Sequence, residues 1–153
     1  MRRRYAPSST KSLAANMSPL PDDLQAEFIE HLQSRYDETG PGQLLSARDI
    51  ERWTEIVGST RRHAYDVIAK HLALGFHEGR LSFWFCDAVA IAVIGFVYDD
   101  FVTQGEDSWP DFFNRVYLAF DAGEVSRPEV NPIEKFTRPM IAEIVRDLAH
   151  DTG

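Results

Sequence analysis

Five side chains able to carry protons or bind ions are grouped around the start of the longest apolar segment of the chain. They are His71, then His77, Glu78 and Arg80 in a turn flanked by glycines, and Asp87 inside the apolar run. Imidazole and carboxyl groups serve as general acids and bases when held close together. If the turn brings these groups together, they form a pocket for a substrate or a regulatory ligand.

Two of these residues also have a purely structural interpretation. His71 falls on the apolar side of its helix, where a histidine is ordinarily a hydrogen-bonded core residue. Asp87 lies in the second turn of an apolar helix, and a buried carboxylate is costly unless it is paired. We therefore expect Asp87 either to pair with Arg61, Arg62 or Arg80, or to line a cleft with a raised pKa.

A second group of candidates consists of acidic residues at the ends of expected helices. These residues are Asp99, Asp100, Glu106 and Asp107 at the end of the apolar segment, and Asp121 and Glu124 around Gly123. Negative charge at a helix C-terminus opposes the helix dipole, so helix stability does not explain these residues. They form either a solvated acidic surface or a site for a basic partner, with Trp109 or Tyr98 as an aromatic anchor.

The sequence carries no pattern that predicts a catalytic residue, a metal site or a bound cofactor. It has no GxSxG elbow, phosphate-binding glycine loop or HExxH pair. His63 and Asp66 are three residues apart on one helix face, but no further ligand accompanies them. The single cysteine, Cys86, lies in the apolar run and is expected to be a small buried hydrophobic residue without a disulfide partner.

The charge of the chain is unevenly distributed. The 153 residues carry a net charge of −8, but residues 1–20 begin with a basic stretch containing Arg2, Arg3, Arg4 and Lys11. The other 12 basic residues face all 24 acids, which gives residues 12–153 a charge of −12. Such a body repels phosphate backbones, so a basic protein is a better partner than a nucleic acid.

Two further interpretations concern the N-terminal segment and the longest apolar run of the chain. Residues 1–20 are expected to form a flexible tail, which is an extension before an initiator at Met17 or a segment resembling a transit peptide. The uninterrupted apolar run, residues 88–98, is too short for a membrane span of about 20 residues. We therefore expect a cytoplasmic protein without a membrane partner.

The hydrophobic pattern predicts helices throughout residues 21–153. Helix starts are indicated at Pro21, at Ser46 with Asp49, at Ser59 or Thr60, at Leu81 or Ser82, at Ser108 and at Asn131. Pro139 should kink or split the last helix near Thr137. Segment 81–102 is apolar on every side, which is typical of a buried helix. These features predict an all-α domain, an irregular bundle of about six helices around 81–102.

Three functions are compatible with these patterns. The first is a small acidic protein that blocks or holds a basic protein, in the manner of an inhibitor or immunity protein. The second is a helical enzyme or ligand sensor with a pocket near Asp87 and His77. The third is a self-associating structural protein, because the aromatic segments 83–85 and 112–113 exceed what one domain covers.

Overall fold

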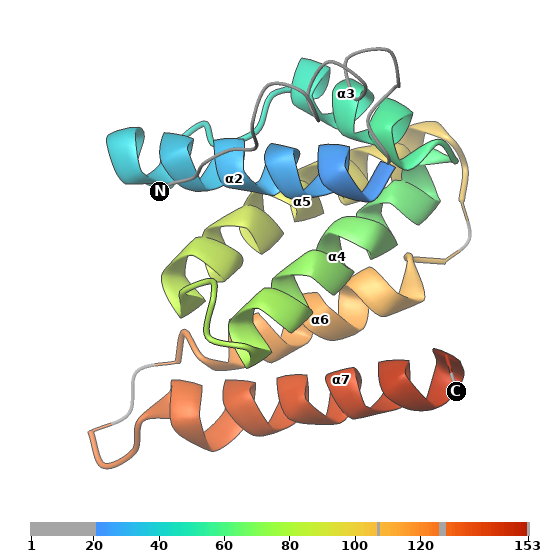
Figure 1. Cartoon of the computed structure of the whole chain (residues 1–153). Helices are drawn as coiled ribbons and strands as arrows, with labels where there is room; N and C mark the ends of the chain where they lie inside the picture. The colour runs from blue at the N-terminus through green and yellow to red at the C-terminus, as the bar shows by residue number, and fades with distance from the viewer. Residues whose placement is uncertain (1–20, 107, 126–127, 153) are drawn as a thin grey trace, which may run out of the picture.

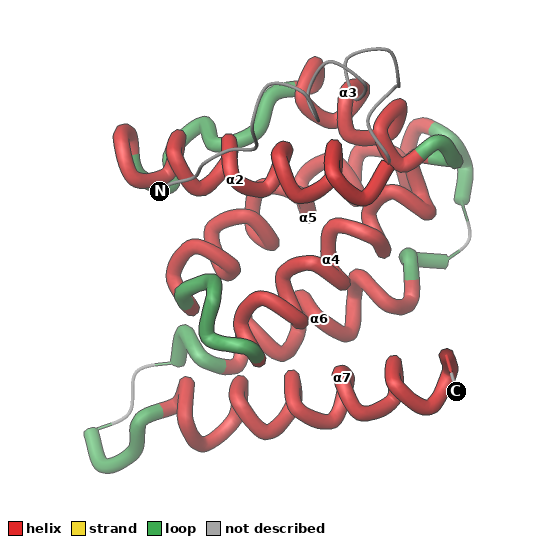
Figure 2. Tube along the Cα trace, in the orientation of Figure 1, coloured by secondary structure: helices red, strands yellow, loops and turns green. Residues whose placement is uncertain are grey.

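The computed structural model describes residues 21–106, 108–125 and 128–152, which form helices and connecting loops (Figure 1, Figure 2). The elements in chain order are α2 (Pro21–Thr39), α3 (Ala47–Val57), α4 (Arg61–His77), α5 (Phe83–Thr103), α6 (Asp111–Ala122), the five-residue π-helical turn η1 (Ile133–Thr137) and α7 (Arg138–Thr152). The described residues confirm the predicted all-α bundle of about six helices. The tail expected over residues 1–20 lies outside the described residues.

Local capping chemistry fixes several helix ends. The Ser46 hydroxyl accepts a hydrogen bond from the Asp49 amide (3.1 Å), and the Asp49 carboxylate accepts one from the Ser46 amide (2.8 Å). This reciprocal pair is the predicted capping box, and it starts α3. Gly58, with φ of 73°, ends α3 in the left-handed conformation that glycine adopts at little cost. Thr60 and Ser82 cap α4 and α5 with their hydroxyl groups.

The start of α6 differs from the expectation. Ser108 does not cap this helix, because its hydroxyl accepts a hydrogen bond from the Arg62 guanidinium (2.8 Å). The helix begins three residues later, and its Phe113 amide donates to the carboxylate of Asp66 on α4 (2.8 Å). Trp109 precedes the helix and stacks on Phe101 at 5.4 Å between ring centroids. A tertiary contact thus replaces the local cap.

The predicted break near Thr137 is present. Pro139 has no amide hydrogen to donate to the preceding turn, and the chain there forms the wide turn η1, in which the Arg138 amide donates to the carbonyl of Ile133. Thr137 is fully buried at this junction. Its hydroxyl donates to the carbonyl of Ala119 on α6 at 2.6 Å, which joins the start of α7 to the end of α6.

The hydrophobic core is built mainly on α4. This helix crosses the middle of the bundle in Figure 1 and packs against α3, α5, α6 and α7. Large side chains from five helices are fully buried around it, including Trp53, Tyr65, Phe85, Phe113, Phe120 and Ile141. Trp53 also donates from its indole nitrogen to the carbonyl of Ala64 (2.8 Å), so its polar atom is satisfied inside the core.

Helix α5, which corresponds to segment 81–102, has two different sides. Its inner side is in the core, where Phe85, Cys86, Val89, Val93 and Val97 are almost completely inaccessible to solvent. Its other side faces outward, although it is just as apolar. Within the described parts of the chain, no helix combines the length with the apolar character that a membrane crossing requires.

Candidate functional site

The outward side of α5 forms a continuous apolar stripe. We call the residues that line it the outer stripe: Trp84, Ala88, Ile91, Gly95, Tyr98 and Val102. Successive members are four or three residues apart, the spacing that keeps side chains on one face of a helix. Trp84, Ile91, Tyr98 and Val102 are 57%, 47%, 60% and 61% exposed. These four expose on the order of 400 Å², an area typical of a functional patch on a monomer.

A shallow groove borders the outer stripe on the side of the α2–α3 connection. This groove has a volume of about 300 Å³, and it is lined by Pro41, Gln43, Leu44, Leu45, Ala88, Ile91 and Ala92. Leu44 and Leu45 form its floor, since both are buried. A side chain of the size of leucine that reached over the edge of α5 would find an apolar site there.

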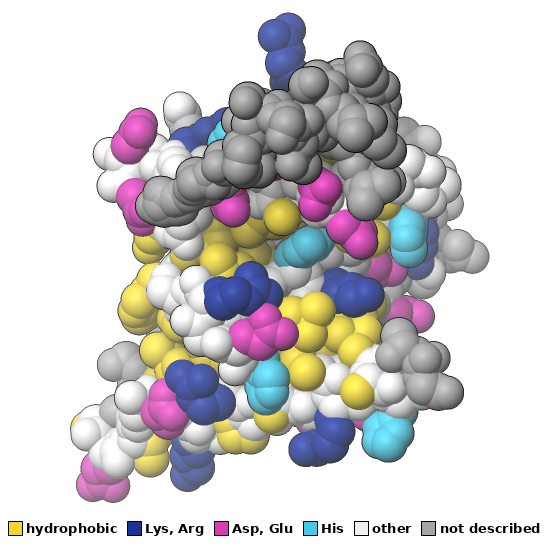
Figure 3. Space-filling model, in the orientation of Figure 1, with side chains coloured by type: hydrophobic (Ala, Val, Ile, Leu, Met, Phe, Trp, Pro, Cys, Tyr) yellow, Lys and Arg dark blue, Asp and Glu magenta, His cyan; other side chains and the backbone are white. Residues whose placement is uncertain are grey.

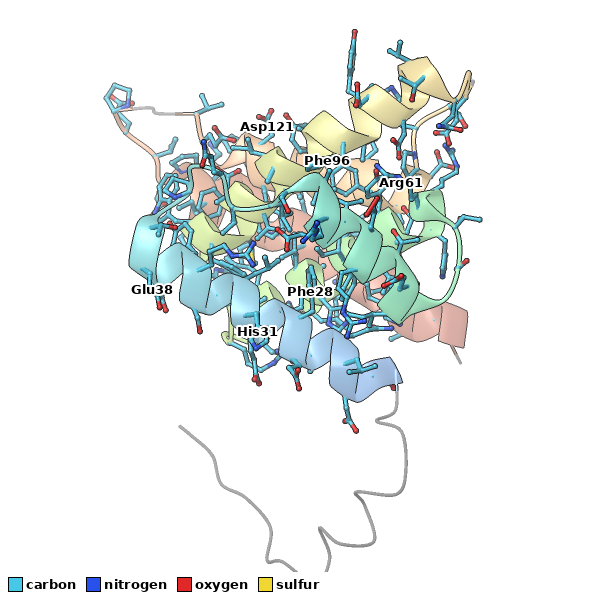
Figure 4. The ribbon with its side chains drawn as sticks, turned by 90° about the horizontal axis from the view of Figure 1, so that it is seen from above. Phe28, His31, Glu38, Arg61, Phe96 and Asp121 are labelled. Carbon is cyan, nitrogen blue, oxygen red and sulfur yellow. The ribbon has the colours of Figure 1, made fainter. Side chains whose placement is uncertain are left out.

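Carboxyl groups gather on the opposite border of the outer stripe. Asp87, on α5, lies against Glu124 in the turn after α6, and Asp121 at the end of α6 is close enough to act on it electrostatically. We call these three residues the acid cluster. In the view down from α2 and α3, Asp121 lies at the far edge of the bundle beside α5, whereas Glu38 and His31 lie on the edge formed by α2 (Figure 4).

The environment of Asp87 disfavours its charged form. Burial raises the pKa of Asp87 to about 7, and the hydrogen bond and negative charge of Glu124 and the charge of Asp121 act in the same direction. Tyr117 on α6 is part of the same environment, because burial and then Asp121 and Glu124 raise the pKa of its hydroxyl. Asp87 therefore keeps its proton to a higher pH than an exposed aspartate does, and this proton reduces its repulsion from the neighbouring carboxyl groups.

The prediction that Asp87 pairs with an arginine is wrong, because Arg61, Arg62 and Arg80 form ion pairs with other residues. Arg61 binds Asp100, Arg62 binds Glu106, and Arg80 binds Glu78. No Lys, Arg or His in the described residues forms an ion pair with a member of the acid cluster. Helix α5 itself contains three aspartates and no basic residue.

Two of the acids predicted for partner binding are used inside the fold. Asp100 is buried, and it accepts two hydrogen bonds from Arg61 (2.8 and 3.0 Å) and one from the Tyr65 hydroxyl (2.6 Å). The hydrogen bond to Asp100 raises the pKa of Arg61 further, while burial raises that of Tyr65. Glu106 is held by Arg62 at 3.1 Å. These pairs connect the start of α4 with the end of α5.

The remaining members of that predicted set have different positions. Asp99 is exposed beside the outer stripe, and Asp121 and Glu124 are exposed in the acid cluster. Trp109 is partly buried between Phe101 and Tyr98, whose ring lies 6.1 Å from it. Asp107 lies outside the described residues. Trp109 thus supports Tyr98, and Tyr98 is the more exposed ring of the two.

The five residues predicted to form a pocket are not all brought together. His71 and Arg80 line one cavity of about 450 Å³ between α2 and the α4–α5 turn, and Glu78 binds Arg80 at 2.7 Å. His77 is exposed at the end of α4. Asp87 belongs to the acid cluster instead.

His71 has the hydrogen-bonded, partly buried position expected of a core histidine. Its Nε2 is 2.8 Å from the Gln25 side-chain oxygen, and burial lowers the pKa of its ring. Its ring also contacts Trp53 edge-on at 5.8 Å. A second cavity of about 500 Å³ on its other side is lined by residues of α2, α4, α6 and α7. The face drawn in Figure 3 carries basic, acidic and histidine side chains around exposed apolar atoms.

No three His, Cys, Asp or Glu side chains within the described ranges are grouped so as to hold a metal ion. Burial raises the pKa of the Cys86 thiol, which keeps this cysteine protonated in the core. No family model, curated protein or solved structure matches the chain. Its function must therefore be inferred from the chemistry of its own surfaces.

Proposed function

We propose that this chain is a small cytoplasmic protein that binds a basic protein partner, as an inhibitor or immunity protein does. The binding surface is the outer stripe of α5 together with the acid cluster. One observation carries this proposal: a stripe of apolar side chains about half exposed lies directly beside carboxyl groups that have no basic partner among the described residues.

The two parts of this surface support binding in different ways. Burial of the outer stripe gains roughly 25 cal/mol for each Å² of apolar area removed from water. The acid cluster attracts a positively charged surface and disfavours other partners. A typical stable interface buries about 800 Å² on each side, so the exposed Leu118 of α6 and the groove beside Leu44 would also contribute.

Charge makes a second copy of the chain a poorer occupant of this surface. Pairing the outer stripes of two copies brings together the exposed Asp99, Asp121 and Glu124 of each copy, and α5 contributes no basic residue. The whole chain also carries a net charge of −8. A basic partner replaces this repulsion by attraction.

Capture from a lysate of the producing cells tests the proposal when matched variants are compared. We expect the wild-type chain to retain a basic protein at about 50 mM salt and to release most of it at about 500 mM. Ile91→Glu should abolish capture, and Asp121→Asn with Glu124→Gln should weaken it.

The controls change the same residue types elsewhere. Met140→Glu places the same charge on an exposed apolar site of α7, and Glu51→Gln removes an exposed carboxylate from α3. Both variants should capture the partner as well as the wild type. Equal capture by Ile91→Glu and Met140→Glu would contradict the proposal.

The cavities on both sides of His71 favour a second candidate, a ligand sensor. Their volumes, about 450 and 500 Å³, fall in the range of small-molecule sites. Gln25 and Arg80 would supply polar contacts. A thermal-shift screen of metabolites tests this candidate: a ligand of the sensor should stabilise the wild type, and its effect should disappear in His71→Leu.

A further inference from the structure

We propose that the element recognised on α5 is an amphipathic helix of the partner, with an apolar seam laid along the outer stripe and a Lys or Arg placed over the acid cluster. This inference rests on the proposed function and specifies the chemistry of the partner. Its support comes from the spacing of the outer stripe, from the asymmetry of its two borders and from the buried carboxyl group of Asp87.

The spacing of the outer stripe matches a helix better than an extended peptide. Trp84, Ile91 and Tyr98 are seven residues apart, so neighbouring anchors are separated by about 10 Å along α5. A partner helix with an apolar residue at every third or fourth position presents side chains about 5 Å apart along its axis, so every second one coincides with an anchor. An extended strand, with about 6.6 Å between side chains on one face, drifts out of register.

Small residues between the anchors allow a second helix to come close. Gly95 is exposed between the large side chains Ile91 and Tyr98 of the outer stripe, whereas Ala88 is buried. A Cβ atom added to Gly95 meets no other atom within 4 Å, so the space above this residue is empty. A large side chain of a partner helix would enter this position, as a knob enters a hole in a pair of packed helices.

The two borders of the outer stripe fix the orientation of such a helix. The groove beside Leu44 and Ala92 accepts an apolar side chain on one border, and the acid cluster accepts a cation on the other. A helix with its basic edge toward Asp121 and Glu124 satisfies both borders together. A helix docked with its apolar edge toward the acid cluster would leave carboxyl groups facing an apolar surface, which costs free energy.

The protonated form of Asp87 adds a dependence on pH to this binding. The titratable groups that face Asp87 are Glu124, Asp121 and Tyr117 from α6 and the turn after it, and Cys86 from its own helix. A Lys or Arg beside the pair favours two carboxylates, so the proton leaves Asp87 for the solvent when the cation docks. Because Asp87 otherwise loses this proton near pH 7, affinity should rise by about tenfold between pH 6 and pH 8.

A displayed library of randomised 20-residue peptides tests this inference. The library is selected on the wild-type protein after depletion on Ile91→Glu. We expect the enriched peptides to have apolar residues with a helical period and a Lys or Arg at one fixed position beside that seam. Peptides with alternating apolar residues, peptides with acidic residues at that position, or no enrichment over Ile91→Glu would overturn the inference.

The proton dependence is measured on an enriched peptide in synthetic form. Its affinity should rise by about tenfold from pH 6 to pH 8, and the rise should be lost when its basic residue is replaced by glutamine or when the protein carries Asp87→Asn. A rise that persists in both cases contradicts the role of Asp87. Light scattering of the free protein must show the mass of one chain, 17.4 kDa. A dimer that Ile91→Glu disrupts would assign the surface to a second copy of the chain and overturn the inference.

The results separate this inference from the proposed function. Capture of a basic protein that depends on Ile91, together with library peptides of no helical period, leaves the proposed function standing and rejects the helix. If neither the lysate capture nor the peptide library depends on Ile91, both the proposed function and this inference are rejected.

Discussion

The carboxyl group of Asp87, on the second turn of α5, lies against the carboxyl group of Glu124 in the turn after α6. Asp87 is only 5% exposed, so water screens this contact weakly. Burial and the nearby Glu124 and Asp121 disfavour the charged form of Asp87, so its carboxyl group holds a proton more strongly than an exposed aspartate does. This proton is retained until about pH 7, the pKa of Asp87. The same contact thus lowers stability in neutral solution and offers a place for a cation.

The first prediction concerns the pH dependence of stability. In the unfolded chain Asp87 ionises near its ordinary pKa of 3.8, whereas the folded protein keeps the proton until about pH 7. The unfolded state therefore binds fewer protons between these values, and stability falls as pH rises from about 4 to 7. Asp87→Asn removes this loss. Its free energy of unfolding should exceed that of the wild type by about 2 kcal/mol at pH 8. This difference is smaller than the whole pKa shift would give at ~1.4 kcal/mol per pKa unit, the value for a fully desolvated group.

Urea unfolding at pH 4 and pH 8 checks this prediction. The two proteins should be equally stable at pH 4, and the variant should be more stable only at pH 8. Glu51→Gln, an exposed change on α3, is the control and should leave the difference between the two pH values unaltered. A loss of stability in Asp87→Asn at pH 8 would show that the carboxylate is favourably paired.

The second prediction compares Gly95 on α5 with Gly123 at the end of α6. A Cβ atom at Gly123 would collide with the hydroxyl of Thr137 and the ring of Phe83, whereas one at Gly95 would enter open space. Gly123→Ala should cost about 1–3 kcal/mol through overpacking. Gly95→Ala should stabilise the protein by about 0.5–1 kcal/mol, because alanine has the higher helix propensity.

Thermal unfolding of both variants provides the measurement. The midpoints should move in opposite directions. A loss of stability in Gly95→Ala would indicate that the outer stripe is covered in the isolated protein, contrary to its observed exposure.

The third prediction concerns the ion pair between Arg61 and Asp100. Arg61→Met leaves the Asp100 carboxylate with only the Tyr65 hydroxyl as a partner. Because Arg61 is partly solvated, we expect a loss of about 1–3 kcal/mol, less than for a fully buried pair. A double-mutant cycle with Asp100→Asn should show coupling, since the losses of the single variants should exceed together the loss of the double variant. Additive losses would mean that the pair contributes nothing of its own.

The sequence predicts those helix ends that depend on neighbouring residues. Ser46 and Asp49 form their capping box within one turn, and Gly58 ends the same helix with a hydrogen bond from its amide to the carbonyl of Thr54. Pro139 likewise disturbs its own helix. The start of α6 was mispredicted, because Asp66 supplies its cap from another helix and Arg62 occupies Ser108.

The candidate site was only partly predictable, because it depends on long-range contacts. Asp87, Asp121 and Glu124 were each noticed, but in separate groups, since nothing local indicates that α5 and the end of α6 meet. Asp100 was expected at the surface, and its pairing with Arg61 joins residues 39 positions apart. The outer stripe was missed because α5 is apolar all round, so hydrophobic periodicity does not distinguish its open face. The seven-residue spacing of the large side chains Trp84, Ile91 and Tyr98 was the available signal.

Hydroxyl-radical footprinting is the most direct test of the outer stripe as a binding surface. The purified protein and the same protein in a lysate of the producing cells are labelled, and oxidation is compared by mass spectrometry with Met140 as the internal reference. We predict that oxidation of Trp84, Ile91 and Tyr98 falls severalfold relative to Met140 in the lysate, and that Ile91→Glu prevents this protection of Trp84 and Tyr98. Unchanged oxidation of the three residues would contradict the account.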